Sequence, residues 1–132
     1  MAKTLYLLRH AKSAWDETGA SDRERGLNRR GRRNAPQMGR ALAQRIDAQT
    51  VHVSPARRAQ LTLGGLSDGW PELQGHSHVT EEALYTFSGD ELIEWLQGCD
   101  DSQDPLFLIG HNPAFTELVN WVCGETALDN LP

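Results

Sequence analysis

The sequence predicts an α/β fold built around a mostly parallel sheet. Apolar runs at residues 4–8 and 106–109 lack regular polar alternation, which is typical of strands buried on both faces of a parallel sheet. Segments with helical spacing of apolar residues separate the two runs. Each run also leads to a histidine, His10 after Arg9 and His111 after Gly110. Because chemistry gathers beyond the carboxyl ends of such strands, these histidines are predicted to share one site.

The first half of the chain supplies two predicted helices and a short strand. Asn28 is a candidate N-cap for a helix over residues 29–46, and Pro36 lies inside it. A strand is predicted at residues 50–53. Ser54 as N-cap and Pro55 at the first position indicate a second helix, which is expected to end near residues 64–65, where two glycines follow each other.

In the second half, residues 67–80 are expected to be irregular and residues 84–87 extended. Ser88, with Glu91 at the capping-box position, predicts a helix that ends at Gly98. A strand at residues 106–109 and a last helix after Asn112 follow. That helix is expected to point four apolar residues inward: Phe115, Leu118, Val119 and Val122. The alternation of strands and helices favours an α/β sandwich.

The chain length fits a single domain over residues 1–132, and no closing element is apparent in residues 128–132. The carboxyl end is therefore expected to be truncated or incomplete. No run of about 18 apolar residues indicates a membrane span, and no signal-peptide pattern precedes the first strand. Two cysteines, Cys99 and Cys123, do not make a disulfide framework, and we expect a cytoplasmic protein.

Charge is distributed unevenly along the sequence. All 13 Lys and Arg lie within residues 1–58, whereas 13 of the 18 acids lie after that point. A nucleic-acid partner is disfavoured because the arginines are spread around a predicted helix, without aromatic residues to stack on bases. An anion pocket in the first half explains the charge better.

Arginines accompany the two histidines at the predicted strand ends. Arg9 directly precedes His10, and Arg57 and Arg58 lie where the helix after residues 50–53 begins, a position that favours anions. A single histidine in such a place is most often structural. Two histidines with several guanidinium groups instead indicate a phosphate site with its own nucleophile, because an imidazole nitrogen can attack phosphorus.

Three motifs, in order, resemble the histidine phosphatase superfamily. They are Leu8-Arg9-His10-Ala11-Lys12-Ser13, Ser54-Pro55-Ala56-Arg57-Arg58-Ala59-Gln60-Leu61-Thr62 and Gly110-His111-Asn112-Pro113. Ala11 replaces the glycine of the general motif. The first and third motifs, and the stretch from Arg25 to Gly31, are similar to the branch of SixA-type phosphohistidine phosphatases. The resemblance implies a three-layer α/β/α sandwich of the phosphoglycerate mutase-like type.

The same resemblance implies roles for particular residues. His10 would be the nucleophile, Arg9 and Arg58 would clamp the phosphate, and His111 would donate a hydrogen bond to it. Arg25 and Ser13 are candidate substrate-binding residues. Members of this family need no metal, and neither a metal nor another cofactor is expected.

The main departure from the family pattern is the lack of an evident general acid. Thr86 occupies the slot where mutase-like members carry a glutamate, and Glu81, Glu82 and Asp90 are nearby candidates. Since a P–N bond depends less on such an acid, the sequence favours phosphohistidine in a protein as substrate, with inorganic phosphate as product. Two alternatives remain: a phosphatase for a small phosphate ester, and a phosphate-binding module without turnover.

Overall fold

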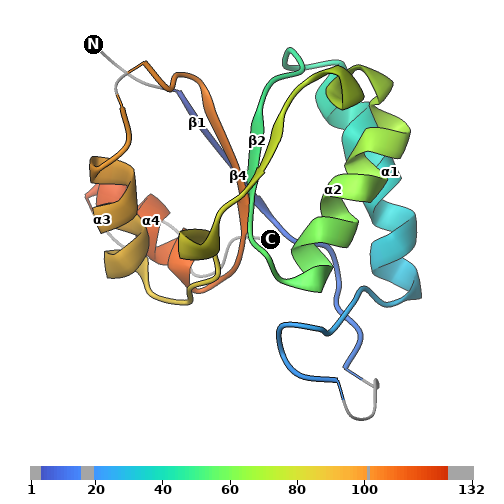
Figure 1. Cartoon of the computed structure of the whole chain (residues 1–132), viewed down its shortest axis with the longest axis horizontal. Helices are drawn as coiled ribbons and strands as arrows, with labels where there is room; N and C mark the ends of the chain where they lie inside the picture. Colours follow the sequence, from blue (N-terminus) through green and yellow to red (C-terminus); the bar gives the residue numbers. More distant parts are fainter. Residues whose placement is uncertain (1–3, 16–19, 101, 125–132) are drawn as a thin grey trace.

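A wholly parallel sheet of four strands forms the centre of this computed structural model, which describes residues 4–15, 20–100 and 102–124. The strands lie in the order β1 (Leu5–Arg9), β4 (Leu106–Gly110), β2 (Val51–Val53) and β3 (His78–Thr80). Helices α1 (Arg29–Ala43) and α2 (Arg57–Gly69) cover one face, and α3 (Gly89–Gln97) and α4 (Ala114–Cys123) cover the other (Figure 1). The predicted three-layer α/β/α sandwich is thereby confirmed.

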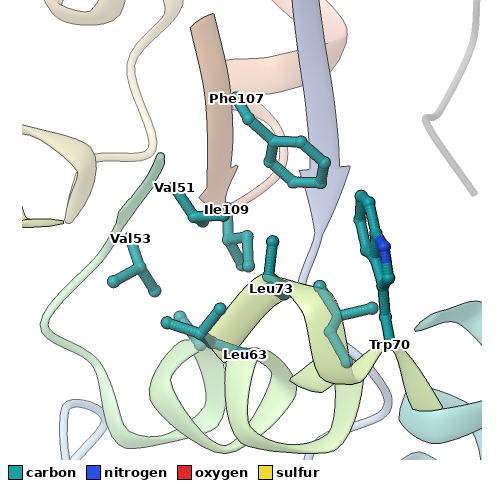
Figure 2. Packing of buried hydrophobic residues seen from close by; sticks show 9 residues of the cluster. Val51, Val53, Leu63, Trp70, Leu73, Phe107 and Ile109 are labelled. Carbon is teal, nitrogen blue, oxygen red and sulfur yellow. The ribbon is translucent and has the colours of Figure 1, made fainter. Parts of the chain in front are cut away.

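Alternating side chains of β4 supply both cores. Phe107 and Ile109 pack towards α2, in a cluster with Val51 and Trp70 (Figure 2). The intervening side chains of β4 pack against α3 and α4 on the other face. Strand β4 is buried throughout, as predicted, whereas β1 is only half-buried. The reason is position, because within the described residues β1 pairs with β4 alone and so forms an edge of the sheet.

Two helices begin at the predicted caps. The Asn28 side chain accepts a hydrogen bond from the Gly31 amide at 2.8 Å, and the Ser88 side chain accepts one from the Glu91 amide. The capping box is completed indirectly. The Thr86 hydroxyl donates to the Glu91 carboxylate at 2.6 Å and accepts from the Ser88 amide, so it stands between the two residues that the motif would join directly.

Helix α2 differs from its prediction at both ends. It begins at Arg57 with Ala56 as N-cap, and it continues through the two glycines to Gly69. Open space surrounds Gly64, whereas Gly65 and Gly69 allow α1 to approach α2 closely. A Cβ atom on Gly65 would lie 2.5 Å from the Cβ of Ala35, and one on Gly69 would overlap the carbonyl oxygen of Pro36.

Three other expectations in the second half are wrong. Residues 67–80 are not irregular, because they hold the end of α2, the 3-10 helix η1 (Pro71–Gly75) and β3. Residues 84–87 do not extend, since the 3-10 helix η2 (Glu82–Leu84) turns the chain there. Val122 is 64% exposed rather than inward-facing. No helix within the described ranges has the length and apolar character needed to cross a bilayer.

Candidate active site

The carboxyl ends of three neighbouring strands bring the site together. The His10 amide donates to the Gly110 carbonyl at 3.1 Å, and the Ser54 amide donates to the Ile109 carbonyl at 3.0 Å. The segments after β1, β2 and β4 therefore meet at one edge of the sheet. The ring centroids of His10 and His111 lie 5.2 Å apart, as the predicted shared site requires.

A pocket of about 680 Å³ opens at this edge. Five of the six predicted site residues line it: Arg9, His10, Ser13, Arg25 and Arg58. The sixth, His111, is not among the lining residues and is only 1% exposed. Its ring lies against Tyr85 and Phe87, with centroid distances of 5.6 and 5.4 Å. His111 thus lies beside His10 but beneath an aromatic cover.

Arg58 lies at the centre of the site. Its side chain is 1% exposed, and its three nitrogens donate to three acceptors. Nε points to His10 Nε2 at 3.4 Å, while the terminal nitrogens donate to the Asp22 carbonyl at 2.5 Å and the Asp22 carboxylate at 3.1 Å. A buried guanidinium held on all sides is a rigid donor for an anion.

His10 has one ring nitrogen held and the other directed at Arg58. Nδ1 lies 2.7 Å from the Ala11 carbonyl, which can only accept, so Nδ1 carries the proton. Nε2 then keeps its lone pair, consistent with the Arg58 Nε donor in front of it. Burial lowers the pKa of His10 to about 4, the bond to Ala11 opposes that shift, and neighbouring arginines add to it. At neutral pH His10 is therefore an uncharged imidazole whose Nε2 carries a lone pair that faces the Arg58 guanidinium.

His111 is held by a serine from the neighbouring strand end. Its Nε2 lies 2.8 Å from the Ser54 hydroxyl, which also accepts from the Ala56 amide at 3.2 Å. Burial lowers the pKa of His111 to about 3, and the charges of His10 and Arg58 contribute. Its Nδ1 is buried without a hydrogen-bond partner among the described residues. A buried unpaired nitrogen costs about 1–3 kcal/mol, so a phosphoryl oxygen would be a favourable partner.

Arg25 is a further guanidinium group that lines the pocket. Its guanidinium carbon lies 3.7 Å from the ring centroid of Trp15, and its terminal nitrogen forms an ion pair with the Asp22 carboxylate at 3.1 Å. Its Nε is buried with no hydrogen-bond partner in the described part of the chain. Arg25 therefore has a donor left for a bound anion.

The loop after β1 is anchored by two contacts that were not predicted from the sequence. The Thr62 hydroxyl accepts from the Ala11 amide at 2.9 Å and donates to the Arg58 carbonyl at 2.7 Å. The start of α1 packs on the same loop, because a Cβ on Gly31 would overlap the Lys12 carbonyl oxygen. The i, i+4 spacing of Arg58 and Thr62 on one helix is the signal that could have revealed this link.

The candidate general acids do not reach the pocket. Glu81, Glu82 and Asp90 are absent from its lining, and Glu82 instead pairs with Arg23 at 2.6 Å. In the described chain the carboxylate that lines the pocket is Asp22. Burial alone would raise its pKa, but hydrogen bonds from Tyr85 and Arg58 and nearby positive charges lower the pKa of Asp22 below its usual value. Asp22 is thus ionised at neutral pH and is a poor proton donor.

A model of branch 1 of the histidine phosphatase superfamily matches residues 5–102. The chain belongs to this superfamily. Solved structures of similar fold agree with that assignment. No curated protein sequence matches the chain significantly.

Two similar structures belong to proteins assigned as SixA phosphohistidine phosphatases. The one from Agrobacterium tumefaciens is 26% identical, with a TM-score of 0.79 over 95% of this chain and 79% of that one. The other, a protein histidine phosphatase SixA complexed with tungstate, is also 26% identical, with a TM-score of 0.72 over 87% and 73% of the chains. A mycobacterial glucosyl-3-phosphoglycerate phosphatase, 16% identical over 98% and 81% of the chains with a TM-score of 0.63, shares the fold. The family and these likenesses support a phosphatase.

Buried neutral histidines in this histidine phosphatase predict a specific dependence of stability on pH. The unfolded chain binds protons near pH 6.5, whereas folded His10 and His111 remain neutral down to about pH 4 and 3. We expect the free energy of unfolding to fall as pH drops below 6.5, by about 1.4 kcal/mol per pH unit for each histidine at the steepest point. Urea unfolding of the wild type and of His111→Gln at pH 7, 6 and 5 measures this. An equal slope in the variant would contradict the prediction.

Proposed function

We propose that this chain is a phosphohistidine phosphatase that moves the phosphoryl group from a protein histidine to His10 and then to water. The observation that carries the proposal is the state of His10. Its Nδ1 is tied to the Ala11 carbonyl and its Nε2 lone pair is directed at the buried guanidinium of Arg58. This arrangement supplies a nucleophile and a positive group to hold the phosphoryl oxygens.

In the first step, His10 Nε2 forms a bond to phosphorus while the bond from phosphorus to the substrate imidazole breaks. The leaving imidazole takes a proton from solvent and departs neutral, since the ionised Asp22 does not supply one. Arg9, Arg58 and Arg25 stabilise the negative charge on the phosphoryl oxygens, and Ser13 lines the substrate side of the pocket. In the second step, water attacks phosphorus and the bond to His10 breaks, so that its electron pair returns to Nε2. The proton lost by water passes to solvent, and inorganic phosphate leaves.

His111 is proposed to donate to the phosphoryl group through Nδ1. A proton donated by the Ser54 hydroxyl to Nε2 places the ring proton on Nδ1, the nitrogen that lacks a partner. Because the low pKa of His111 keeps the ring neutral at pH 7, it acts as a hydrogen-bond donor rather than as a cation.

A P–N substrate suits this site better than an unactivated ester. An alkoxide leaving group needs a proton donor, yet Thr86 is bonded to Glu91 and Asp22 stays ionised. An imidazole can be protonated without a dedicated acid. A phosphatase for small esters and a phosphate-binding module are the alternatives, and the nucleophilic state of His10 favours turnover over binding alone. The positive groups make a metal-independent reaction reasonable.

The pocket mouth has a charge pattern that supports a protein substrate. Helix α1 begins with four exposed arginines, Arg29, Arg30, Arg32 and Arg33, and with no acid in its first turn. Positive charge is unfavourable at a helix N-terminus, so this arrangement lowers the stability of the helix. Arg30 and Lys12 add two positive side chains to the lining of the pocket. Acidic side chains around a phosphohistidine would complement them.

A charge reversal at Arg30 tests this preference. We expect Arg30→Glu to raise the KM for a phosphohistidine protein about 5- to 10-fold, the effect of one rim charge, while the KM for p-nitrophenyl phosphate changes far less. Steady-state kinetics on both substrates measure the difference. Arg40→Glu is the matched control, since Arg40 is exposed on the same helix but does not line the pocket. Equal effects of the two reversals would argue against docking at the pocket mouth.

The proposal as a whole is tested by comparing two substrates in the presence of EDTA. A phosphohistidine protein should be turned over faster than p-nitrophenyl phosphate, and EDTA should have no effect. Faster ester cleavage would favour the small-molecule phosphatase, and no cleavage of either would favour a binding module.

We place the enzyme in the cytoplasm, where the exposed Cys123 would stay reduced, and treat residues 1–132 as one domain.

A further inference from the structure

The Asp22 carboxylate occupies the positive groups of the pocket. Oδ2 accepts from the Arg58 guanidinium at 3.1 Å and from the Tyr85 hydroxyl at 2.5 Å, while Oδ1 pairs with Arg25 at 3.1 Å. Two guanidinium groups and a hydroxyl therefore converge on one internal anion. These are donors of the type and charge that a phosphoryl group would need.

The carboxylate is not needed to hold Arg58 in place. The Asp22 main-chain carbonyl already accepts from another nitrogen of Arg58 at 2.5 Å, and that guanidinium is almost completely buried. The main chain next to Asp22 is held as well, because the Arg57 amide donates to the Arg23 carbonyl at 2.8 Å. In contrast, the Asp22 side chain is 43% exposed, so it can rotate towards solvent.

A bound phosphoryl group and the carboxylate would compete. Both are anions, and both would lie against the guanidinium groups of Arg58 and Arg25, so close placement of the two is costly. Hydrogen bonds lower the pKa of Asp22, so the carboxylate stays charged at neutral pH. Protonation of Asp22 therefore does not relieve the repulsion.

We propose that Asp22 is an internal competitor for the phosphate site: its carboxylate holds Arg58 and Arg25, and it turns aside when a phosphoryl group binds. The inference rests on the proposed use of these arginines as the phosphate clamp. Its consequence is a weaker affinity for phosphate, which speeds release of the product. Asp22 thus determines the affinity of the site without taking part in the chemical steps.

Anion binding to the folded protein tests the proposal. Calorimetric titration with inorganic phosphate and with tungstate should give dissociation constants about 5- to 20-fold lower for Asp22→Asn than for the wild type at pH 7.5. Asparagine keeps the size and one acceptor oxygen but removes the charge. Asp22→Ala should tighten binding in the same direction, and urea unfolding checks that both variants remain folded.

The matched control is Glu24→Gln, which removes the same charge from the same segment. Glu24 is exposed and bonds to Ser21, and it does not line the pocket. Its affinity for both anions should stay within twofold of the wild type. Equal tightening in Glu24→Gln would overturn the proposal, because net charge alone would then explain the effect.

Failure of this inference can be told apart from failure of the proposed function. If the wild type binds both anions and Asp22→Asn binds them equally or more weakly, Asp22 instead positions the arginines and the inference is wrong. If neither protein binds either anion, the assignment of the clamp itself is wrong, and the proposed phosphatase site fails with it.

Discussion

His10→Ala is expected to abolish phosphatase activity, with a loss on the order of 10⁵- to 10⁶-fold, as for removal of other covalent nucleophiles. The reason is that no other uncharged imidazole lines the described pocket, and His111 lies beneath Tyr85 and Phe87. Turnover of a phosphohistidine protein, followed as release of inorganic phosphate, measures the loss.

The control for His10→Ala is His76→Ala, which removes an exposed imidazole outside the pocket. It should leave kcat and KM unchanged. Substantial activity in His10→Ala, with the fold intact by circular dichroism, would contradict the covalent mechanism.

Arg58→Ala has the second largest expected effect. Loss of this buried, pre-positioned donor should lower kcat/KM on the order of 10²- to 10³-fold, or about 3–4 kcal/mol of transition-state stabilisation. Arg58→Lys should recover only part of the activity, because an ammonium group lacks the fork that now reaches His10 and Asp22. Steady-state kinetics on the wild type and both variants measure these effects.

Arg57→Ala serves as the comparison for Arg58→Ala. Arg57 adjoins it in the chain, is exposed and does not line the pocket. Its removal should alter kcat/KM by less than a factor of about three, the scale of exposed charges. Similar losses in the two variants would show that the charge of the segment, rather than the placed guanidinium, supports activity.

The ends of the strands were predictable because a buried strand appears in the sequence as an uninterrupted apolar run. The apolar run of β4 and the histidines at the two strand ends were sufficient to place His10 beside His111, since β1 and β4 are neighbours in a parallel sheet. The half-burial of β1 was not predictable, because an apolar run does not reveal which strand lies at an edge.

Glycine caused the main error in the helices. Gly64 and Gly65 indicate a helix end in the sequence, but the helix continues to Gly69, and Gly65 and Gly69 allow α1 and α2 to pack closely. That role depends on the neighbouring Ala35 and Pro36, which local reasoning cannot place. Strand β3 was missed because its side chains are exposed, and a short exposed strand lacks the hydrophobic pattern that predicts one.

The arginines of the site were predictable from motifs, whereas their partners were not. Asp22 lies in a polar loop with other charged residues, and nothing local distinguishes it from a solvated acid. Its contact with Tyr85 joins residues 63 positions apart and emerges only from the fold. The prediction of a general acid among Glu81, Glu82 and Asp90 was wrong because the partners of these residues also depend on the fold. Glu82, for example, pairs with Arg23 and does not line the pocket.

The central claim is a covalent phosphohistidine on His10. It is tested most directly by mixing the enzyme with a radiolabelled phosphohistidine protein, quenching within milliseconds to seconds, and measuring label on this chain. We expect an alkali-stable, acid-labile label that maps to the peptide with His10 and is missing in His10→Ala. Phosphate release from the wild type with no label on the chain at any time, or label that persists in His10→Ala, would contradict it.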